Sequence, residues 1–242
     1  MISDAVQQVV GDKAVVIGLM GPGVDPHLFK ATRGDLIKLR DADIIFYYGL
    51  HLEGKMGEVL EKLTAQKPVY AVGETIANDS LIYHGKNADS KDPHIWFDVS
   101  KWVKVVKTIS NDLAAFDQGN KVVFEENAAQ YIAQLQKLHQ EVTDSIASIP
   151  SEQRVLITAH DAFSYFGEAY DIEVKGLQGI STVSEFGLKD VSDLVNFIVD
   201  RKIKAVFVES SIPTRSLEAV IAGCKQKGHD VQIGGTLYSD AM

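Results

Sequence analysis

The sequence predicts an α/β protein of two lobes, each with a parallel-type sheet, joined by one long rigid helix. Short apolar runs alternate with amphipathic stretches from residue 14 onward, which is the pattern of βαβ units. Residues 121–149 interrupt this alternation with one continuous helical pattern, and a second alternating series starts after Pro150. We therefore expect a first lobe over residues 1–118, a linking helix over 119–149 and a second lobe over 150–242.

The first lobe is predicted to begin with a helix over residues 2–10, because apolar side chains recur on one side of it. Ala14–Leu19 is a short apolar run, which is typical of a parallel strand covered on both faces. Thr32–Arg40 is expected to form a helix with Leu36 and Leu39 directed inward. The other expected elements are strands at 42–48 and 68–72, helices at 55–65 and 99–116, and an irregular polar stretch at 78–91.

The linking helix is indicated by apolar residues that recur every three or four positions from Phe124 to Ile149, with no Gly or Pro before Pro150. About 28 residues at roughly 1.5 Å each give a helix on the order of 40 Å long, which is enough to join two lobes. The second lobe is predicted to contain strands at 154–158, 172–175, 205–208 and 231–233, with a short helix after His160 and longer helices at 188–201 and 214–227.

Composition narrows the class of protein. The 242 residues are 45% hydrophobic and 24% charged, as in an ordinary globular protein, and no apolar run approaches the length of a membrane span. A net charge of −9 argues against a nucleic acid as partner. Cys224 is the single cysteine, so neither an intramolecular disulfide nor a thiolate metal cluster can form. Met1 does not open an export signal, which leaves a cytosolic chain or a trimmed export product open.

The tripeptide Asp-Pro-His occurs twice, as Asp25–His27 and as Asp92–His94. Proline fixes its own φ near −65° and pushes the preceding residue out of the helical region, so each histidine is presented on a stiff turn. A ligand presented in this way loses little entropy on binding. Metal coordination is the obvious reason for the repeat.

Two further candidate ligands follow predicted strands of the second lobe. His160 follows strand 154–158 and Asp240 follows strand 231–233, while His27 follows the run 14–19, and crevices form beyond the carboxyl ends of parallel strands. With His94 these residues make a set of three imidazoles and one carboxylate. Such a set suits Zn²⁺, Mn²⁺ or Fe²⁺, and suits Cu⁺ or Ca²⁺ poorly.

Neighbouring residues are given supporting roles. Glu209, at the end of strand 205–208, is the best candidate to accept a hydrogen bond from a ligating imidazole. Asp161 is expected to cap the helix that follows it. The remaining histidines are assigned surface or structural roles: His51, His84, His139 and His229.

Catalysis finds less support than binding. Ser164 and Ser210 lack the Gly-x-Ser-x-Gly elbow of a nucleophile, and the glycines near residues 21 and 54 lack a dinucleotide fingerprint. Four protein ligands leave no open position for water or substrate, which favours holding a metal over reacting at it. A mononuclear metal hydrolase or oxidoreductase that uses a bound water as fifth ligand stays open as the rival class.

Seven segments spread over the whole chain together resemble the metal-specific solute-binding proteins of bacterial ABC transporters, in particular the TroA-type zinc and manganese binders. The segments are Gly21–His27, Tyr48–Glu53, Asp92–Asp98, Thr158–Phe163, Val174–Gly179, Glu209–Pro213 and Gln232–Asp240. The resemblance implies two α/β lobes joined by a backbone helix, with one metal ion in the cleft between them. Its motifs place the ligands at His27, His94, His160 and Asp240.

The resemblance also implies a function and a location. It predicts a monomeric extracytoplasmic protein, periplasmic or lipid-anchored, that captures a divalent transition metal and delivers it to an ABC permease. Many manganese and iron members carry Glu where His160 stands, and the stretch 78–91 lacks the His-rich insert of many zinc importers. The metal is therefore left between Zn²⁺ and Mn²⁺, with Fe²⁺ less favoured. Members normally have an exported leader, one more initial strand and a helix beyond Asp240; we expect that trimming removed these segments.

Overall fold

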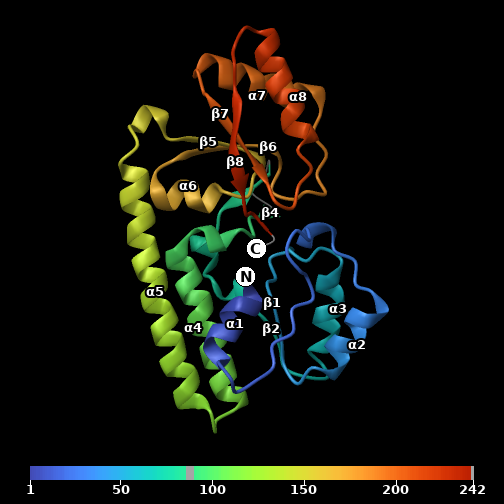
Figure 1. Ribbon diagram of the computed structural model, residues 1–242. Coiled ribbons are helices and arrows are strands. Elements are labelled where there is room, and N and C mark those ends of the chain that lie inside the picture. The colour runs from blue at the N-terminus through green and yellow to red at the C-terminus, as the bar shows by residue number, and fades with distance from the viewer. Residues whose placement is uncertain (86–89, 241–242) are drawn as a thin grey trace.

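The long helix predicted after residue 120 is present and runs along the side of the molecule (Figure 1). The computed structural model describes residues 1–85 and 90–240, and in it this helix, α5, spans Lys121–Ala147. Its first half packs against helices of the first lobe and its second half reaches α6 of the second lobe. The helix therefore ties the two lobes together along one edge.

The first lobe combines helices with two short sheets. Strand β1 pairs with β2 in parallel, with Ile45 opposite Val69, and β3 pairs with β4 in an antiparallel hairpin. The bounds are α1 Ile2–Val10, α2 Arg33–Asp41, β1 Ile45–Tyr47, α3 Met56–Leu63, β2 Val69–Ala71, β3 Tyr83–His84, β4 Ser90–Lys91 and α4 Val99–Phe116. Short 3₁₀ turns lie at Pro26–Leu28, Val72–Thr75, Asn78–Ser80 and Ile95–Phe97.

The second lobe is a more regular α/β unit. Strand β5 pairs in parallel with β6 and β7 pairs in parallel with β8, while β5 lies beside β7. Parallel strands bring their carboxyl ends to one edge, and here that edge faces the first lobe (Figure 1). The bounds are β5 Val155–His160, α6 Ser164–Tyr170, β6 Glu173–Gln178, α7 Leu188–Asp200, β7 Ala205–Glu209, α8 Arg215–Gln226 and β8 Gln232–Leu237, with a 3₁₀ turn at Ser151–Gln153.

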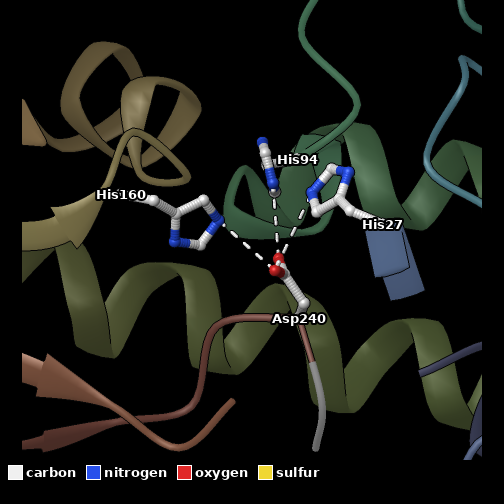
Figure 2. A group of neighbouring side chains, drawn as sticks. All are labelled: His27, His94, His160 and Asp240. Atoms are coloured by element: carbon white, nitrogen blue, oxygen red, sulfur yellow. Dashed lines mark ion pairs between the residues drawn. The ribbon is translucent and has the colours of Figure 1, made fainter. Parts of the chain in front are cut away.

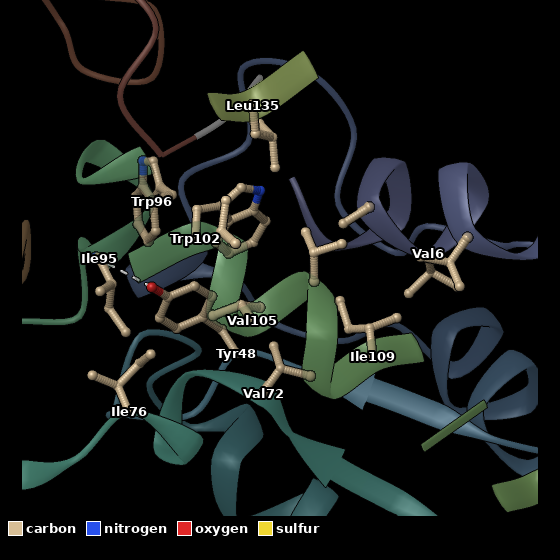
Figure 3. Close-up of a cluster of buried hydrophobic side chains, with 14 of the residues drawn as sticks. Val6, Tyr48, Val72, Ile76, Ile95, Trp96, Trp102, Val105, Ile109 and Leu135 are labelled. Atoms are coloured by element: carbon tan, nitrogen blue, oxygen red, sulfur yellow. Dashed lines mark hydrogen bonds between the residues drawn. The ribbon is translucent and has the colours of Figure 1, made fainter. Parts of the chain in front are cut away.

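The largest hydrophobic cluster combines buried residues of α1, α4 and α5 with residues outside these helices, among them Tyr48, Val72 and Ile95 (Figure 3). Tyr48, Trp96 and Trp102 pack together in it, and the Tyr48 hydroxyl accepts a hydrogen bond from the backbone N–H of Ile95. Tyr165 also belongs to this cluster although it comes from α6 of the second lobe. A side chain of one lobe is thus buried in the core of the other.

The predicted strand at Ala14–Leu19 is wrong. Among the described residues this segment pairs with no strand, and the side chains of Val15 and Ile17 are 89% and 63% exposed. Within this run, Val16 packs on the main cluster of the first lobe and Leu19 packs on a smaller one. A continuous apolar run does not reveal whether both of its faces are covered, and here one face is open.

Smaller differences concern helix faces and ends. Leu39 is buried as expected, but Leu36 is 45% exposed, and the buried neighbour is Asp35, which closes a capping box with Thr32. Strand β5 extends to His160, two residues beyond the predicted end at Thr158, so His160 lies in the strand rather than after it. The predicted fold class of two α/β lobes and a long helix is confirmed, while the boundaries proposed between lobes and helix stay a prediction. No helix within 1–85 and 90–240 combines the length and apolarity that crossing a bilayer requires.

Candidate metal site

His27 lies on a short 3₁₀ turn that its own sequence builds. Pro26 starts the turn, and the side chain of Asp25 accepts a hydrogen bond from the backbone N–H of His27 at 2.9 Å. Gly54 has φ +48° and approaches the His27 carbonyl so closely that a Cβ atom would lie 2.8 Å from the carbonyl oxygen. The neighbouring loop therefore depends on glycine at this position to support the turn.

His94 is held by the aspartate of the second Asp-Pro-His copy. Asp92 Oδ1 accepts two hydrogen bonds from His94, one from the backbone N–H at 2.9 Å and one from ring Nδ1 at 2.7 Å. Both side chains are fully buried. The carboxylate fixes the proton on Nδ1, which leaves Nε2 to face the cleft as a lone-pair donor.

His160 receives the same support from Glu209 on the adjoining strand. Glu209 Oε2 lies 2.5 Å from ring Nδ1, and Oε1 accepts the backbone N–H of His160 at 2.9 Å. Residues 160 and 209 end β5 and β7, two strands that lie beside each other. The hydrogen bond that Glu209 was predicted to accept from a candidate ligand is thus present.

Asp240 arrives from the segment that follows β8. The carbonyl oxygen of the preceding residue, Ser239, accepts a hydrogen bond from the Trp96 indole N–H at 3.1 Å. Because Trp96 lies two residues after His94 and packs edge-on to its ring, this bond joins the segment that carries Asp240 to the turn that carries His94.

The structure brings these four side chains to one point between the lobes (Figure 2). Asp240 Oδ1 lies 3.3 Å from His94 Nε2, and Oδ2 lies 3.3 Å from His160 Nε2 and 3.8 Å from His27 Nε2. One ligand atom from each residue lies within 4.8 Å of the others, and all four residues are buried. Two come from each lobe.

The electrostatics of the site are those of a carboxylate among imidazoles. Burial alone would raise the pKa of Asp240, but the facing rings of His160 and His94 hold it far below its usual range. Burial alone would lower the pKa of His160, yet Asp240 and Glu209 raise it to about 10. The pKa of His94 is also raised above its ordinary value, by Asp240 and Asp92. Burial lowers the pKa of His27 to about 4. At neutral pH the site holds positive charge on His160 against an ionised Asp240.

The donor atoms fit a cation. The three Nε2 atoms and both Asp240 carboxylate oxygens are buried and satisfy no hydrogen bond among the described residues. Only ion pairs of 3.3 to 3.8 Å hold these atoms to one another, and a metal ion at their common point would bind all of them. Three nitrogens and a carboxylate also match the donors that Zn²⁺ and its neighbours in the first transition row prefer. That these residues ligate a metal stays a prediction.

The other histidines lie outside this point. His51 lies exposed in a loop, and His229 bonds the carbonyl of Ile203 at the opposite end of β8. The position of His139 on the linking helix predicts a solvated side chain, but it is half-buried and bonds the Tyr170 hydroxyl at 3.0 Å, so that prediction is wrong. His84 contacts Asp92, which the surface role assigned to it did not anticipate.

Sequence reasoning missed three supporting residues: Asp92, His84 and Trp96. Asp92 carries a signal in the sequence, because it belongs to the repeated tripeptide and an aspartate two residues before a histidine can reach its backbone N–H. His84 and Trp96 act across the fold, on partners that sequence spacing does not identify.

A buried cluster of potential metal donors between two lobes is the arrangement expected of a protein that binds a small cation. Residues 1–242 match the family model described as ZnuA, the periplasmic component A of a zinc-uptake complex. The chain belongs to this family of substrate-binding proteins.

Individual relatives agree with this assignment. Over 241 residues the chain is 49% identical to the manganese-binding lipoprotein MntA of Bacillus subtilis (strain 168), with all of this chain and 78% of the relative covered. It is 48% identical over 242 residues to the zinc-binding protein TroA of Treponema pallidum (strain Nichols), with the same coverage. The solved structure of periplasmic TroA from Treponema pallidum matches with a TM-score of 0.97, over 100% of this chain and 87% of that one.

Proposed function

We propose that this protein captures one divalent transition metal ion at His27, His94, His160 and Asp240 and delivers it to an ABC transporter permease for uptake. The observation that carries the proposal is the convergence of four buried donor groups, two from each lobe, within 4.8 Å. Family membership of the whole chain supports the transport role. The metal ion is the cargo of the protein.

The proposed cargo is Zn²⁺ or Mn²⁺, with Fe²⁺ less favoured. A three-nitrogen, one-carboxylate set accepts all three ions, and the two relatives of nearly equal identity carry different metals in their names. Both Asp240 oxygens face imidazole nitrogens, so this carboxylate can bind through one oxygen or two. In vitro, Zn²⁺ is expected to bind more tightly than Mn²⁺ because the Irving–Williams order favours it.

Binding is favoured over catalysis by the same geometry. Four protein donors saturate a tetrahedral ion, whereas catalytic zinc sites keep a position for water or substrate. Glu209 and Asp92 already accept from the ring Nδ1 atoms of two candidate ligands, so neither is free to act as a general base. These features support a role that is not enzymatic.

The partner and location follow from the transport role. We propose that the protein works outside the cytoplasm, periplasmic or lipid-anchored, as a monomer with the membrane permease as its partner and no nucleic acid. The names of the relatives, which include lipoproteins, support this location. Residues 1–118 and 150–242 would form the two lobes, with 119–149 between them.

Elemental analysis combined with competitive Zn²⁺ and Mn²⁺ titration tests the proposal. We expect one ion per chain, and we expect His94→Ala to abolish tight binding because it removes a fully buried donor. The control is His229→Ala, which removes a histidine at the far end of β8 and should bind metal as the parent does. Binding that persists unchanged in His94→Ala would reject this site.

A further inference from the structure

His84 occupies a hairpin that reaches the rim of the candidate metal site. It lies in β3 opposite Ser90 of β4, and the backbone N–H of Asp92, directly after β4, donates to the carbonyl of Ile82 at 2.9 Å. This register places His84 beside Asp92. The hairpin also meets the second lobe, because the Tyr165 hydroxyl accepts from the N–H of Ile82 and donates to the carbonyl of Asp92.

The two oxygens of Asp92 serve two different histidines. Oδ1 accepts from ring Nδ1 of His94 at 2.7 Å, while Oδ2 lies 3.2 Å from Nε2 of His84. The side chain of Asp92 is fully buried, and that of His84 is 27% exposed. His84 is therefore the second side-chain donor that fixes the plane of a buried carboxylate, and that carboxylate fixes the ring of His94.

The other ring nitrogen of His84 faces the second lobe. Nδ1 lies 3.7 Å from Asp161 Oδ2, and Asp161 directly follows His160. Asp161 is itself held by its own lobe, since its backbone N–H donates to the Gln178 carbonyl and its Oδ1 accepts from the Ser164 hydroxyl. His84 thus connects Asp92, which holds His94 of the first lobe, to Asp161, which lies next to His160 of the second lobe.

We propose that His84 is a positioning residue that controls how long the site retains its metal ion, by fixing Asp92 behind His94 and by tying the hairpin to Asp161. The proposal rests on the metal-binding function proposed above. An exposed ion pair is worth little in general, but His84 bonds a fully buried carboxylate, and a buried acceptor that loses a donor is costly. Release requires a ligand ring to turn away from the ion, so the dissociation rate is the quantity that His84 governs.

The test is a chelator chase on Zn²⁺-loaded protein. His84→Ala is expected to raise the dissociation rate about tenfold, as loss of a group that supports a metal ligand does, and to retain one ion per chain. The visible absorption spectrum of the Co²⁺-loaded variant should also shift, because the His94 ring is less firmly oriented. A purely structural role for His84 would lower thermal stability without changing that spectrum.

Further variants separate the two contacts. His84→Gln keeps one hydrogen-bonding group and should give an intermediate rate, which also covers the case that His84→Ala folds poorly. Asp161→Asn weakens the contact with His84 between the lobes and leaves an oxygen that can accept from Ser164, so it should have a smaller effect. The double variant with His84→Ala should release metal no faster than His84→Ala alone.

The outcomes distinguish this inference from the proposed function. If His84→Ala and His84→Gln both release Zn²⁺ at the parent rate with an unchanged Co²⁺ spectrum, the positioning role is rejected. If the parent protein binds no ion at the four candidate ligands, the proposed function itself fails. His229→Ala, which removes a half-buried histidine bonded to a backbone carbonyl, is the matched control and should behave as the parent.

Discussion

Two carboxylates decide how the candidate ligands present their nitrogen atoms. Asp92 and Glu209 each bind the backbone N–H and the ring Nδ1 of the histidine they support. Both are buried, so their hydrogen bonds are not exchanged with water. The Nε2 atoms of His94 and His160 are consequently directed at Asp240 by the fold itself. The conformational entropy of the two rings is therefore lost during folding and not when an ion binds.

Replacing Glu209 by Gln tests this orientation. The amide keeps the size of the side chain but loses the charge that holds the Nδ1 proton, so metal affinity should fall by roughly 10- to 100-fold. Competition with a chelator of known affinity measures the change. Glu218→Gln, an exposed position on α8, is the control. Equal affinities for Glu209→Gln and its parent would contradict the orienting role.

The pH dependence of binding follows from the pKa of His160. Its folded value is raised to about 10, so its proton stabilises the metal-free fold below about pH 6.5, its unfolded value, and this contribution is lost as the pH rises through about 10. An entering ion must displace that proton. Affinity should therefore rise as the pH increases toward about 10, and binding at pH 7 should release about one proton. Calorimetry in buffers of different ionisation enthalpy measures the release; none at pH 7 would contradict the argument.

For individual residues, the sequence identifies the candidate ligands but not most of the contacts that hold their side chains in place. The repeated tripeptide singles out His27 and His94, and strand ends single out His160 and Asp240. The expected strand before His27 does not form, however, and its position depends instead on Pro26 and the Asp25 side chain. Contacts such as Trp96 to Ser239, which are 143 residues apart, are set by tertiary structure and leave no periodic signal.

Among the elements, helix α5 shows how a single face determines packing. Phe124, Ala128 and Leu135 are buried against the first lobe, whereas Leu138 is 45% exposed although it continues the same apolar pattern. Beyond Leu135 the helix leaves the main cluster of the first lobe and runs toward α6. The apolar pattern predicted the helix and most of its length. It did not reveal at which residue the helix stops packing against the first-lobe cluster.

Two leucines on this helix form a matched pair for a stability measurement. Leu135→Ala should lower the free energy of unfolding by about 2 to 4 kcal/mol, because it leaves a cavity in the main cluster. Leu138→Ala should cost less than about 1 kcal/mol, since that side chain is largely solvated. Urea unfolding followed by circular dichroism gives both values. Similar costs for the two variants would contradict the burial described for α5.

Helices were easier to predict than strands for a physical reason. The helix at 99–116 matches its predicted bounds, because its amphipathic period, the Asp98 cap and the turn after it all indicate the same start and end. The run 14–19 has strand composition but no partner strand among the described residues. Local sequence specifies a helix, whereas a strand also depends on a neighbour that is distant in the chain.

For the whole molecule, two features restrain movement between the lobes. Helix α5 contacts both of them, and Tyr165 of the second lobe is fully buried in the first-lobe cluster, where its hydroxyl makes two hydrogen bonds. Opening the cleft widely would expose this ring and break both bonds. We therefore expect binding to rearrange the loops that carry the ligands more than the lobes themselves.

Solution scattering tests that expectation. The radius of gyration of the metal-free protein and of the metal-loaded protein should agree closely, because a locked pair of lobes changes its dimensions little. Tyr165→Ala should increase the difference between the two states by freeing the lobes. A large contraction of the parent protein on metal binding would contradict the restraint assigned to α5 and Tyr165.

The central claim is that three imidazoles and one carboxylate from two lobes share a single ion. Anomalous diffraction from crystals of the Zn²⁺-loaded protein, collected on either side of the zinc absorption edge, tests it most directly. We predict one strong peak at about 2.0 to 2.2 Å from Nε2 of His27, His94 and His160 and from the Asp240 carboxylate. A peak at any other place, or one that omits the ligands of either lobe, would contradict the account.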